Sequence, residues 1–340
     1  MSADMSGTMN AGMNAEKNPP LVVEGLTTVL RIDGVWREAV RDVSFTAHAG
    51  ETVALVGESG CGKSLTAMTI MGLLPAGVGK RGAGRVFIEG VETSALDEDR
   101  LETIRGDRIG MIFQEPMTSL NPVLTVGFQI AEALIRHKGL SKGEARERAR
   151  DLMELVRIPA AAERLDAYPH QFSGGMRQRV MIALAIACHP GVLIADEPTT
   201  ALDVTVQMQV LELLQKLQRE QGLAIVLITH NLGVVAGVAD QVVVMYGGDV
   251  VEKAPVKDFF ARPTHPYARA LLAAMPRVDR PTDSLEPIPG QVPPLAAMPE
   301  GCRFQGRCPL REEACATRPA LAEIAPGHFI RCVVKAREAR

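Results

Sequence analysis

The eight residues from 57 to 64, here called the phosphate loop, limit the fold of this 340-residue chain more than any other part of its sequence. They fit the pattern G-x-x-x-x-G-K-[ST] at every fixed position and follow the apolar run Thr52–Val56. Such a run is typical of a buried parallel strand, and a helix is expected to begin near Lys63 with its positive dipole end toward the loop. The sequence therefore predicts an α/β fold that binds ATP. Considered alone, the loop could instead be a glycine-rich turn before an ordinary helix.

Three chemical functions are combined in the phosphate loop. Its glycines let backbone N–H groups close around phosphates, Lys63 supplies a positive charge at the β and γ phosphates, and Ser64 offers a hydroxyl to Mg²⁺. The residues predicted to bind ATP here are Gly57, Glu58, Ser59, Gly60, Cys61, Gly62, Lys63, Ser64 and Leu65.

Two carboxylates end a second apolar run. Residues 192–196 are typical of a buried strand, and Asp196 and Glu197 stand at its carboxyl end, where open α/β sheets bind ligands. Asp196 suits the coordination shell of Mg²⁺, usually through water, and Glu197 suits the positioning or polarising of an attacking water molecule. A solvated strand end with two acids is the alternative, and the presence of Lys63 and Ser64 argues against it.

The segment FSGGMRQR at 172–179, here called the signature segment, lies between these two motifs in the chain. Ser173 and the two glycines after it form an N-terminal anion site if a helix follows, although alone they would be only a helix cap. The segment resembles the signature of ATP-binding cassette (ABC) ATPases, whose usual form begins Leu-Ser-Gly-Gly-Gln. Phe172 and Met176 replace the first and last of those five residues.

Three further motifs stand in the order typical of the ABC family. Gln114 resembles the Q-loop glutamine, residues 201–203 resemble the D-loop, and His230 resembles the switch histidine. Gln114 carries a neutral amide that can contact Mg²⁺ or water, and His230 follows an apolar strand where it can donate a hydrogen bond to a γ-phosphate. Alone, each would be an ordinary amide or a structural histidine. The predicted catalytic residues are Glu197, His230 and Gln114.

The resemblance implies an α/β fold of the ABC nucleotide-binding type. This fold has a P-loop RecA-like core, an antiparallel β part and a helical subdomain, here at about 105–187, and a C-terminal extension that contains cysteines follows it. We expect a disordered leader at 1–20, the ATPase domain at 21–260 and the extension at 261–340.

Local patterns agree with that plan. Residues 141–144 form a capping box for a helix that runs towards Val156. Apolar residues at helical spacing between 206 and 217 should cover one face of the sheet. Strand-like runs are expected at 40–45, 192–196, 224–229 and 241–246, with turns at 33–34 and 50.

The resemblance also implies an ATP site shared by two subunits. In a head-to-tail pair, Lys63 and its neighbours hold ATP from one side and the signature segment of the other subunit holds it from the opposite side, and closure excludes water. Trp36 is the candidate for stacking on the adenine base, with simple packing as the alternative. The residues assigned to ATP binding on these grounds are Ser173, Gly174, Gly175, Met176, Asp203 and Trp36.

Three segments, at 114–122, 265–272 and 288–332, are similar to the ATPases of oligopeptide and dipeptide importers. The similarity implies a peripheral subunit on the cytoplasmic side of the inner membrane that hydrolyses ATP. Its expected partners are two transmembrane permease subunits, a second ABC ATPase that is a sister chain or a copy, and an extracytoplasmic solute-binding protein. Peptides are the expected cargo, and nickel or another non-peptide solute stays open. A soluble cassette ATPase and a subunit with a dead site are the alternatives.

Composition narrows the list of partners. A net charge of -3 and 4% aromatic residues give no basic surface for nucleic acid. The longest apolar stretch, 180–188, is about half of the ~20 residues that a membrane-spanning helix needs. Residues 1–20 lack the apolar centre of a signal peptide, so we expect a cytoplasmic chain.

Four of the six cysteines lie in the C-terminal extension with the spacing C-x5-C-x6-C-x16-C. In a cytosolic chain, clustered thiols favour a metal over disulfides, and four thiolates suit tetrahedral Zn²⁺ or an iron–sulfur cluster. The resemblance favours a [4Fe-4S] cluster, while Zn²⁺ and free thiols stay open. The candidate ligands are Cys302, Cys308, Cys315 and Cys332.

Overall fold

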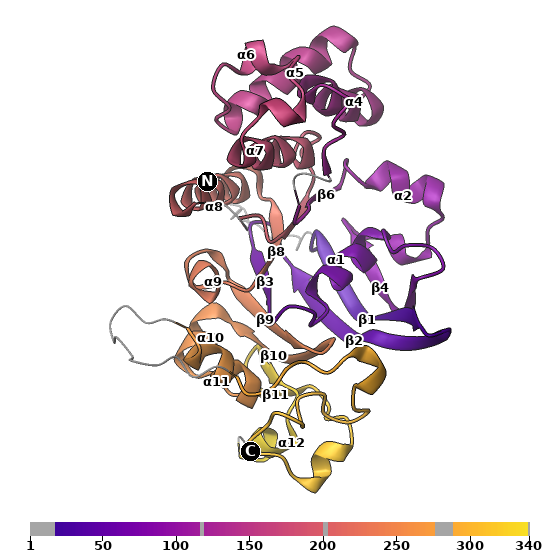
Figure 1. Ribbon diagram of the computed structural model, residues 1–340, viewed down its shortest axis with the longest axis vertical. Helices are drawn as coiled ribbons and strands as arrows, with labels where there is room; N and C mark the ends of the chain where they lie inside the picture. Colours follow the sequence, from indigo (N-terminus) through magenta and orange to yellow (C-terminus); the bar gives the residue numbers. More distant parts are fainter. Residues whose placement is uncertain (1–17, 116–118, 200–202, 276–287, 339–340) are drawn as a thin grey trace, which may run out of the picture.

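A mixed sheet organises the chain (Figure 1). The computed structural model describes residues 18–115, 119–199, 203–275 and 288–338. Within these ranges the strands follow the order β5-β4-β1-β2-β10-β9-β3-β8-β7-β6. The first four strands of this order are antiparallel and the last five are parallel, which is the combination that the ABC resemblance implied.

The parallel part of the sheet is almost completely buried. Its strands are β9 (Gln241–Tyr246), β3 (Thr52–Val56), β8 (Ala224–Thr229), β7 (Val192–Asp196) and β6 (Ile109–Ile112). Every residue of β3, β7 and β8 is buried, because helices or other strands cover both faces, and this explains the continuous apolar runs in the sequence. The strands predicted at 192–196, 224–229 and 241–246 are confirmed, as is the strand before the phosphate loop.

The antiparallel part precedes and follows the phosphate loop in sequence. Its strands are β1 (Leu21–Ile32), β2 (Val35–Ala47), β4 (Gly79–Ile88) and β5 (Val91–Glu92). One residue pair, Arg41 with Asp249, joins β2 to β10 (Asp249–Pro255) and so connects the two parts of the sheet. The strand predicted at 40–45 lies within β2, and the turn predicted at 33–34 joins β1 to β2.

Within the described residues, the predicted helical subdomain at one end of the molecule contains four α-helices (Figure 1). They are α4 (Val126–Lys138), α5 (Lys142–Leu155), α6 (Ala161–Arg164) and α7 (Gly174–Ala185), with the short 3-10 helix η2 (Pro169–Gln171). The predicted capping box is confirmed, since Ser141 and Glu144 exchange side chain to backbone hydrogen bonds at the start of α5. The predicted helical range is wrong at its beginning, because 109–112 form strand β6. Gly110 allows this strand to lie directly against α7, since a Cβ there would be 2.1 Å from the carbonyl oxygen of Ala185.

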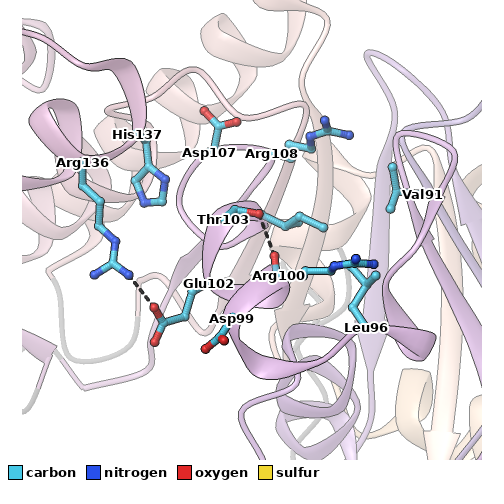
Figure 2. Close-up of a pocket in the computed structure, with 11 residues that line it drawn as sticks. Val91, Leu96, Asp99, Arg100, Glu102, Thr103, Asp107, Arg108, Arg136 and His137 are labelled. Carbon is cyan, nitrogen blue, oxygen red and sulfur yellow. Dashed lines mark hydrogen bonds and ion pairs between the residues drawn. The ribbon is translucent and has the colours of Figure 1, made fainter.

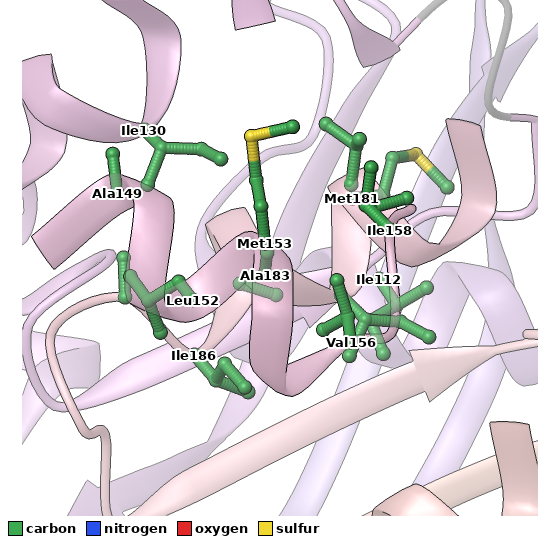
Figure 3. Close-up of a cluster of buried hydrophobic side chains, with 14 of the residues drawn as sticks. Ile112, Ile130, Ala149, Leu152, Met153, Val156, Ile158, Met181, Ala183 and Ile186 are labelled. Atoms are coloured by element: carbon green, nitrogen blue, oxygen red, sulfur yellow. The ribbon is translucent and has the colours of Figure 1, made fainter. Parts of the chain in front are cut away.

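A cluster of buried apolar side chains joins these helices to the sheet (Figure 3). Ile130 of α4, Met153 of α5 and Ala183 of α7 belong to it, together with Ile112 of β6. None of these four is exposed to solvent. Because burial stabilises by roughly 25 cal/mol per Å² of apolar surface, the cluster fixes α7 and its signature segment relative to the sheet.

The other helices flank the sheet. The apolar stripe predicted for the helix before β8, which is α8 (Val204–Gln221), is confirmed as core. Val210, Leu214 and Leu217 are buried, while Val206 and Leu213 are partly buried. The helices that flank the sheet are α1 (Lys63–Met71), η1 (Thr93–Ala95), α2 (Glu98–Ile104), α8 (Val204–Gln221), α9 (Leu232–Val238), α10 (Val256–Ala261) and α11 (Pro266–Ala273).

The C-terminal extension packs against β10 at the end of the molecule opposite the helical subdomain (Figure 1). Beyond α11 it contains η3 (Leu295–Ala297), η4 (Glu313–Ala316), β11 (Ala322–Ala325), β12 (His328–Ile330) and α12 (Val333–Glu338). β12 pairs with β10, and the fully buried Glu252 of β10 lies 2.8 Å from Nε2 of His328. The Glu252 carboxylate also accepts hydrogen bonds from the N–H groups of Thr264 and His265. The extension is therefore tied to the same sheet that carries the phosphate loop.

Across the described ranges, no helix is both long and apolar enough to cross a bilayer. The leader predicted at 1–20 lies outside the described residues except for 18–20, and the first two D-loop residues, 201 and 202, lie outside them as well.

Candidate nucleotide-binding and catalytic site

Four parallel strands end at the same edge of the sheet, and a predicted site element follows each of them. β3 and β8 pair in register up to their last residues, and β7 pairs with β8 along its whole length. The last residue of β6, Ile112, pairs with Ala195, which is one residue before the end of β7. The phosphate loop follows β3, Gln114 follows β6, Glu197 follows β7 and His230 follows β8. Register alone therefore brings together residues that are up to 173 positions apart in the chain, from Gly57 to His230.

Gly57 is required because the phosphate loop passes very close to β9. Its φ is 151°, and a Cβ at this position would lie 2.2 Å from the carbonyl oxygen of Met245. The other end of the loop is tied to the β9–β10 turn, where the N–H of Gly248 donates to the carbonyl of Cys61 at 2.8 Å. Helix α1 begins at Lys63, as predicted. Strand, loop and helix thus have the arrangement that presents backbone N–H groups to phosphates.

Lys63 lies within the phosphate loop and is 6% exposed. Its Nζ donates hydrogen bonds to the carbonyl oxygens of Gly57 at 2.8 Å and Glu58 at 3.0 Å. Burial raises the pKa of the neighbouring Cys61 thiol, which outweighs the attraction of Lys63 for a thiolate. The loop therefore carries a cation next to a neutral thiol.

Asp196 supplies a buried carboxylate next to the loop and is 4% exposed. Burial raises the pKa of its carboxyl group, while a hydrogen bond from Ser64 lowers it. Its Oδ1 is buried and has no hydrogen-bond partner among the residues that the structure describes. A buried unpaired carboxylate oxygen beside a hydroxyl is a donor set that suits a hard divalent cation, so Ser64 and Asp196 fit Mg²⁺.

Glu197 is contacted by both of the other predicted catalytic residues. Its Oε2 lies 3.5 Å from Nε2 of Gln114, and its Oε1 lies 3.2 Å from Nδ1 of His230. The backbone of Glu197 has a φ of 47°, and its N–H donates to the carbonyl of Ile228 in β8. Its carboxylate is therefore oriented by the ends of β6 and β8 as well as by its own strand.

The signature segment begins helix α7. The Ser173 hydroxyl accepts a hydrogen bond from the N–H of Met176 at 3.4 Å and caps the helix, and Ser173 and Gly174 are both exposed. Phe172 is buried under Arg164, while Met176 packs partly against the helical core. The two departures from the usual signature are therefore packing positions, and the polar start of the helix faces solvent.

Two other predicted ATP-binding residues lie at exposed positions. Asp203 caps α8 by accepting a hydrogen bond from the N–H of Val206 at 2.9 Å. Trp36 lies in β2 next to the β1–β2 turn, is 39% exposed, and has Nζ of Lys80 4.6 Å from its ring centroid. Stacking of adenine on Trp36 stays a prediction.

The four cysteines of the extension lie near one another. The N–H of Cys302 donates to the carbonyl of Cys315 at 2.9 Å. Burial raises the pKa of the Cys302 thiol to about 11, and the thiols of Cys315, Cys308 and Cys332 add to that increase. In the described part of the chain, however, no group of three or more His, Cys, Asp or Glu side chains is placed to hold a metal ion. The predicted iron–sulfur cluster or Zn²⁺ site is therefore not confirmed.

Two of the cavities outside the phosphate loop are lined in part by α4 of the helical subdomain. One of about 530 Å³ lies between α2 and α4, where Glu102 pairs with Arg136 beside His137, and no predicted site residue lines it (Figure 2). The second, of about 290 Å³ and more apolar, lies between the parallel sheet and the helical subdomain. Phe113 and Ser119 line it, and they flank Gln114 in sequence.

Sequence reasoning missed two residues that hold the phosphate loop. The hydroxyl of Tyr267 in α11 accepts a hydrogen bond from the N–H of Glu58 at 2.8 Å. Arg307 of the extension pairs with the Glu58 carboxylate through Nη1 at 2.7 Å and Nη2 at 3.1 Å. Both belong to the segments noted for their similarity to importer ATPases, but nothing in the sequence pattern indicates that they contact the loop.

Comparison with known families gives two matches. Residues 40–200 match the family described as ABC transporter, and residues 251–315 match the one described as oligopeptide/dipeptide transporter, C-terminal region. The second match includes three of the four extension cysteines and Arg307.

Similar proteins cover nearly the whole chain. A putative peptide import ATP-binding protein of Brucella abortus is 51% identical over 93% of this chain and 97% of its own length. The dipeptide transport ATP-binding protein DppD of Bacillus subtilis is 50% identical over 92% and 91%, and the oligopeptide transport ATP-binding protein OppD of Escherichia coli is 51% identical over 86% and 87%. Among solved structures, the dimeric ATP-binding cassette MJ0796 with ADP and phosphate has a TM-score of 0.63, with 31% identity over 69% of this chain and 98% of that one.

Proposed function

Because the chain belongs to the ABC transporter family, within its oligopeptide and dipeptide branch, we propose that it hydrolyses ATP to drive peptide uptake through separate membrane permeases. The observation that carries this proposal is the convergence of Gln114 and His230 on Glu197, at the sheet edge where the phosphate loop begins. A regulatory subunit with a dead site needs neither this carboxylate nor its two partners. A soluble cassette ATPase is disfavoured by the importer-type C-terminal region.

Binding of ATP is assigned to the phosphate loop and its neighbours. The N–H groups of the loop and of the start of α1 bind the phosphates. The ammonium of Lys63 exchanges its hydrogen bonds to the carbonyls of Gly57 and Glu58 for contacts with the phosphates. Ser64 and Asp196 would hold Mg²⁺, and the unpaired Oδ1 of Asp196 supports that assignment. When bound, the ion would neutralise negative charge on the β and γ phosphate oxygens.

Hydrolysis is assigned to Glu197. Its carboxylate orients a water molecule for attack on the γ-phosphorus and accepts a proton from it, while the bond to the β–γ bridging oxygen breaks. His230 holds the carboxylate from the β8 side and can donate to the γ-phosphate, and Gln114 holds it from the β6 side. Catalysis of this kind depends mainly on position, and both contacts serve that end.

The site is proposed to be completed by a second cassette. The exposed start of α7 at Ser173 and Gly174 offers backbone N–H groups and a hydroxyl to an anion. The similar cassette MJ0796 is described as a dimer with ADP and phosphate, which supports a pair of cassettes here, and the head-to-tail arrangement is part of the proposal. In that pair the signature segment and Asp203 act on the ATP held by the partner's loop. A sister chain or a copy of this one fits the partner equally.

The apolar cavity beside Gln114 is the proposed contact for a permease subunit. It is lined by Met111 of β6 on one side and by Met181 and Leu184 of α7 on the other, so its shape depends on how the helical subdomain sits on the sheet. Phe113 is 40% exposed at its edge. A permease segment bound there would follow the movement that ATP binding produces at Gln114. The chain would then lie on the cytoplasmic side of the inner membrane, with a solute-binding protein on the other side.

Peptides are the proposed cargo because the similar proteins are named for peptide, dipeptide or oligopeptide transport. An ATPase subunit does not contact the cargo, so its own residues do not distinguish peptides from nickel or another solute. Identification of the ligand that co-purifies with the solute-binding partner is the test, and a non-peptide ligand would overturn this part of the proposal.

Four-thiol ligation in the extension is kept as a separate proposal, with [4Fe-4S] favoured over Zn²⁺. It is supported by the clustering of the four cysteines in sequence and by the backbone hydrogen bond that places Cys302 next to Cys315, although the side chains as placed in the described residues do not form a ligand set. A visible absorption spectrum and metal analysis of anaerobically purified protein decide it. A colourless, metal-free protein contradicts the proposal.

The ATPase proposal is tested with Glu197→Gln, using Glu220→Gln as a control at an exposed carboxylate of α8. Phosphate release by the complete transporter should fall about 100-fold or more in Glu197→Gln, because the water loses its oriented acceptor, and it should be unchanged in the control. Glu197→Gln should still bind ATP and hold the cassette pair closed. Equal hydrolysis by wild type and Glu197→Gln, or loss of ATP binding in that variant, would show that the assigned role is wrong.

A further inference from the structure

We infer that Arg307, in the C-terminal extension, is a positioning residue of the ATP site that holds the phosphate loop and neutralises its one carboxylate, that of Glu58. The inference rests on the proposed function, in which residues 57–64 bind the phosphates of ATP. It gives the extension a direct role in nucleotide affinity.

The contact between Arg307 and Glu58 has the geometry of a specific ion pair. Nη1 and Nη2 of Arg307 donate to Oε2 and Oε1 of Glu58 at 2.7 and 3.1 Å, so both oxygens of the carboxylate are engaged. The Arg307 side chain is 6% exposed and that of Glu58 is 31% exposed. Two parallel charge-assisted hydrogen bonds define orientation as well as distance, and partial burial reduces screening by salt.

Arg307 is itself held rigidly. Its Nε donates to the carbonyl of Pro289 at 2.7 Å, Nη2 also donates to the carbonyl of Ile288 at 3.1 Å, and Nη1 lies 3.4 Å from the Tyr246 hydroxyl. Its guanidinium also stacks over the Tyr246 ring at 5.6 Å. A flexible surface arginine would have none of these contacts, so the geometry points to a fixed support for Glu58.

Glu58 is held at three points. Its N–H donates to the hydroxyl of Tyr267, its carbonyl accepts from Lys63, and its carboxylate binds Arg307. Tyr267 and Tyr246 pack against Phe304 of the extension. The ring centroid of Phe304 lies 5.3 Å from that of Tyr267 and 5.0 Å from that of Tyr246. The extension therefore forms the base on which this end of the phosphate loop rests.

The ion pair also has an electrostatic consequence. Glu58 lies inside a loop whose ligand is a polyanion, and its carbonyl is 3.0 Å from the Lys63 ammonium that pairs with the phosphates. A carboxylate without a partner at this place would repel ATP and compete for Lys63. Arg307 neutralises that charge through the carboxylate of Glu58, whereas Lys63 contacts the carbonyl of the same residue. Arg307 takes no part in the chemistry of hydrolysis.

Equilibrium binding of the fluorescent nucleotide mant-ATP to the full-length chain tests the inference. Arg307→Gln should raise the Kd about tenfold, which corresponds to ~1.4 kcal/mol, whereas Arg307→Lys, which keeps the charge but loses the paired geometry, should raise it about threefold. Arg311→Gln is the matched control, because Arg311 lies four residues further in the same segment, is exposed, and should leave the Kd unchanged.

The double variant Glu58→Gln/Arg307→Gln separates this role from a purely structural one. Removal of both charges should bring the Kd back to within about threefold of wild type, even if the thermal unfolding midpoint stays as low as in Arg307→Gln. The inference is overturned if Arg307→Gln binds mant-ATP like wild type, or if the double variant binds as weakly as the single one. Failure of the wild-type chain to bind mant-ATP at all would instead refute the proposed function.

Discussion

The buried carboxylate of Asp249 provides the sharpest test of how the two parts of the sheet and the extension are joined. Its oxygens accept hydrogen bonds from Arg41 of β2 and from Nη2 of Arg318 at 3.0 Å, and Nε of Arg303 lies 4.0 Å away. The Asp249 side chain is 3% exposed and the Arg41 side chain is 9% exposed. The change Asp249→Asn keeps the shape of the side chain and removes the charge.

The expected loss follows from the arginines that remain. Arg318 keeps Asp42 at 3.6 Å, but Arg41 and Arg303 stay buried without a carboxylate. Burial already lowers the pKa of Arg303 to about 10, which shows how poorly this site accommodates a cation. Removal of one partner from a buried ion pair typically costs about 3–5 kcal/mol of the free energy of unfolding, and we expect a value in that range.

Urea unfolding followed by circular dichroism measures this loss. With a slope of about 3 kcal/mol per M, the midpoint should fall by about 1 M or more while the slope stays constant. Asp166→Asn is the control, because Asp166, like Asp249 with Arg41, binds an arginine through both oxygens, here Arg146 at 2.8 and 2.7 Å, but at an exposed site. That variant should unfold like wild type. Equal midpoint shifts in the two variants would refute the reasoning that burial makes the Asp249 pair important.

Two further predictions concern the phosphate loop and a buried histidine. Gly57→Ala should abolish mant-ATP binding, because its Cβ would meet the carbonyl of Met245 at 2.2 Å, whereas Gly143→Ala, where nothing lies within 4 Å, should bind normally. Burial lowers the pKa of His265 to about 3, so below its unfolded value of about 6.5 only the unfolded chain takes up this proton. The free energy of unfolding should therefore fall as the pH drops from about 6.5 towards 3, by up to ~1.4 kcal/mol per pH unit, and His265→Asn should show a smaller fall in urea midpoints.

Much of the fold could be predicted from local sequence. The parallel strands β3, β7, β8 and β9 are buried on both faces, and continuous apolar runs of strand length reveal them. The capping box at Ser141 predicts the start of helix α5, and the apolar stripe predicts helix α8. Strand β6 was not predicted, because it is only four residues long and includes Gly110. A segment that short shows no clear pattern of apolar residues that would distinguish a strand from the helices around it.

The sequence predicts which residues belong to the candidate site, but not how their side chains contact one another. Residues whose chemistry depends on a contiguous motif, such as the phosphate loop and the signature segment, can be predicted from their spacing. The convergence of Gln114 and His230 on Glu197 follows only after β6, β7 and β8 are placed side by side. For the extension cysteines, spacing suggested a metal, but ligand geometry depends on side-chain placement, and the described residues show no such group.

The sequence by itself determined that this chain places a phosphate-binding loop between a buried strand and a helix, because those requirements are local and fit within about twenty residues of chain. Only the tertiary structure decided what supports that loop. Glu58 and Arg307 are 249 positions apart, and their pairing depends on β12 joining β10 and on Phe304 packing against Tyr267, whose hydroxyl binds the loop. A contact of that kind leaves no periodic pattern, since it joins two segments that are far apart in the sequence.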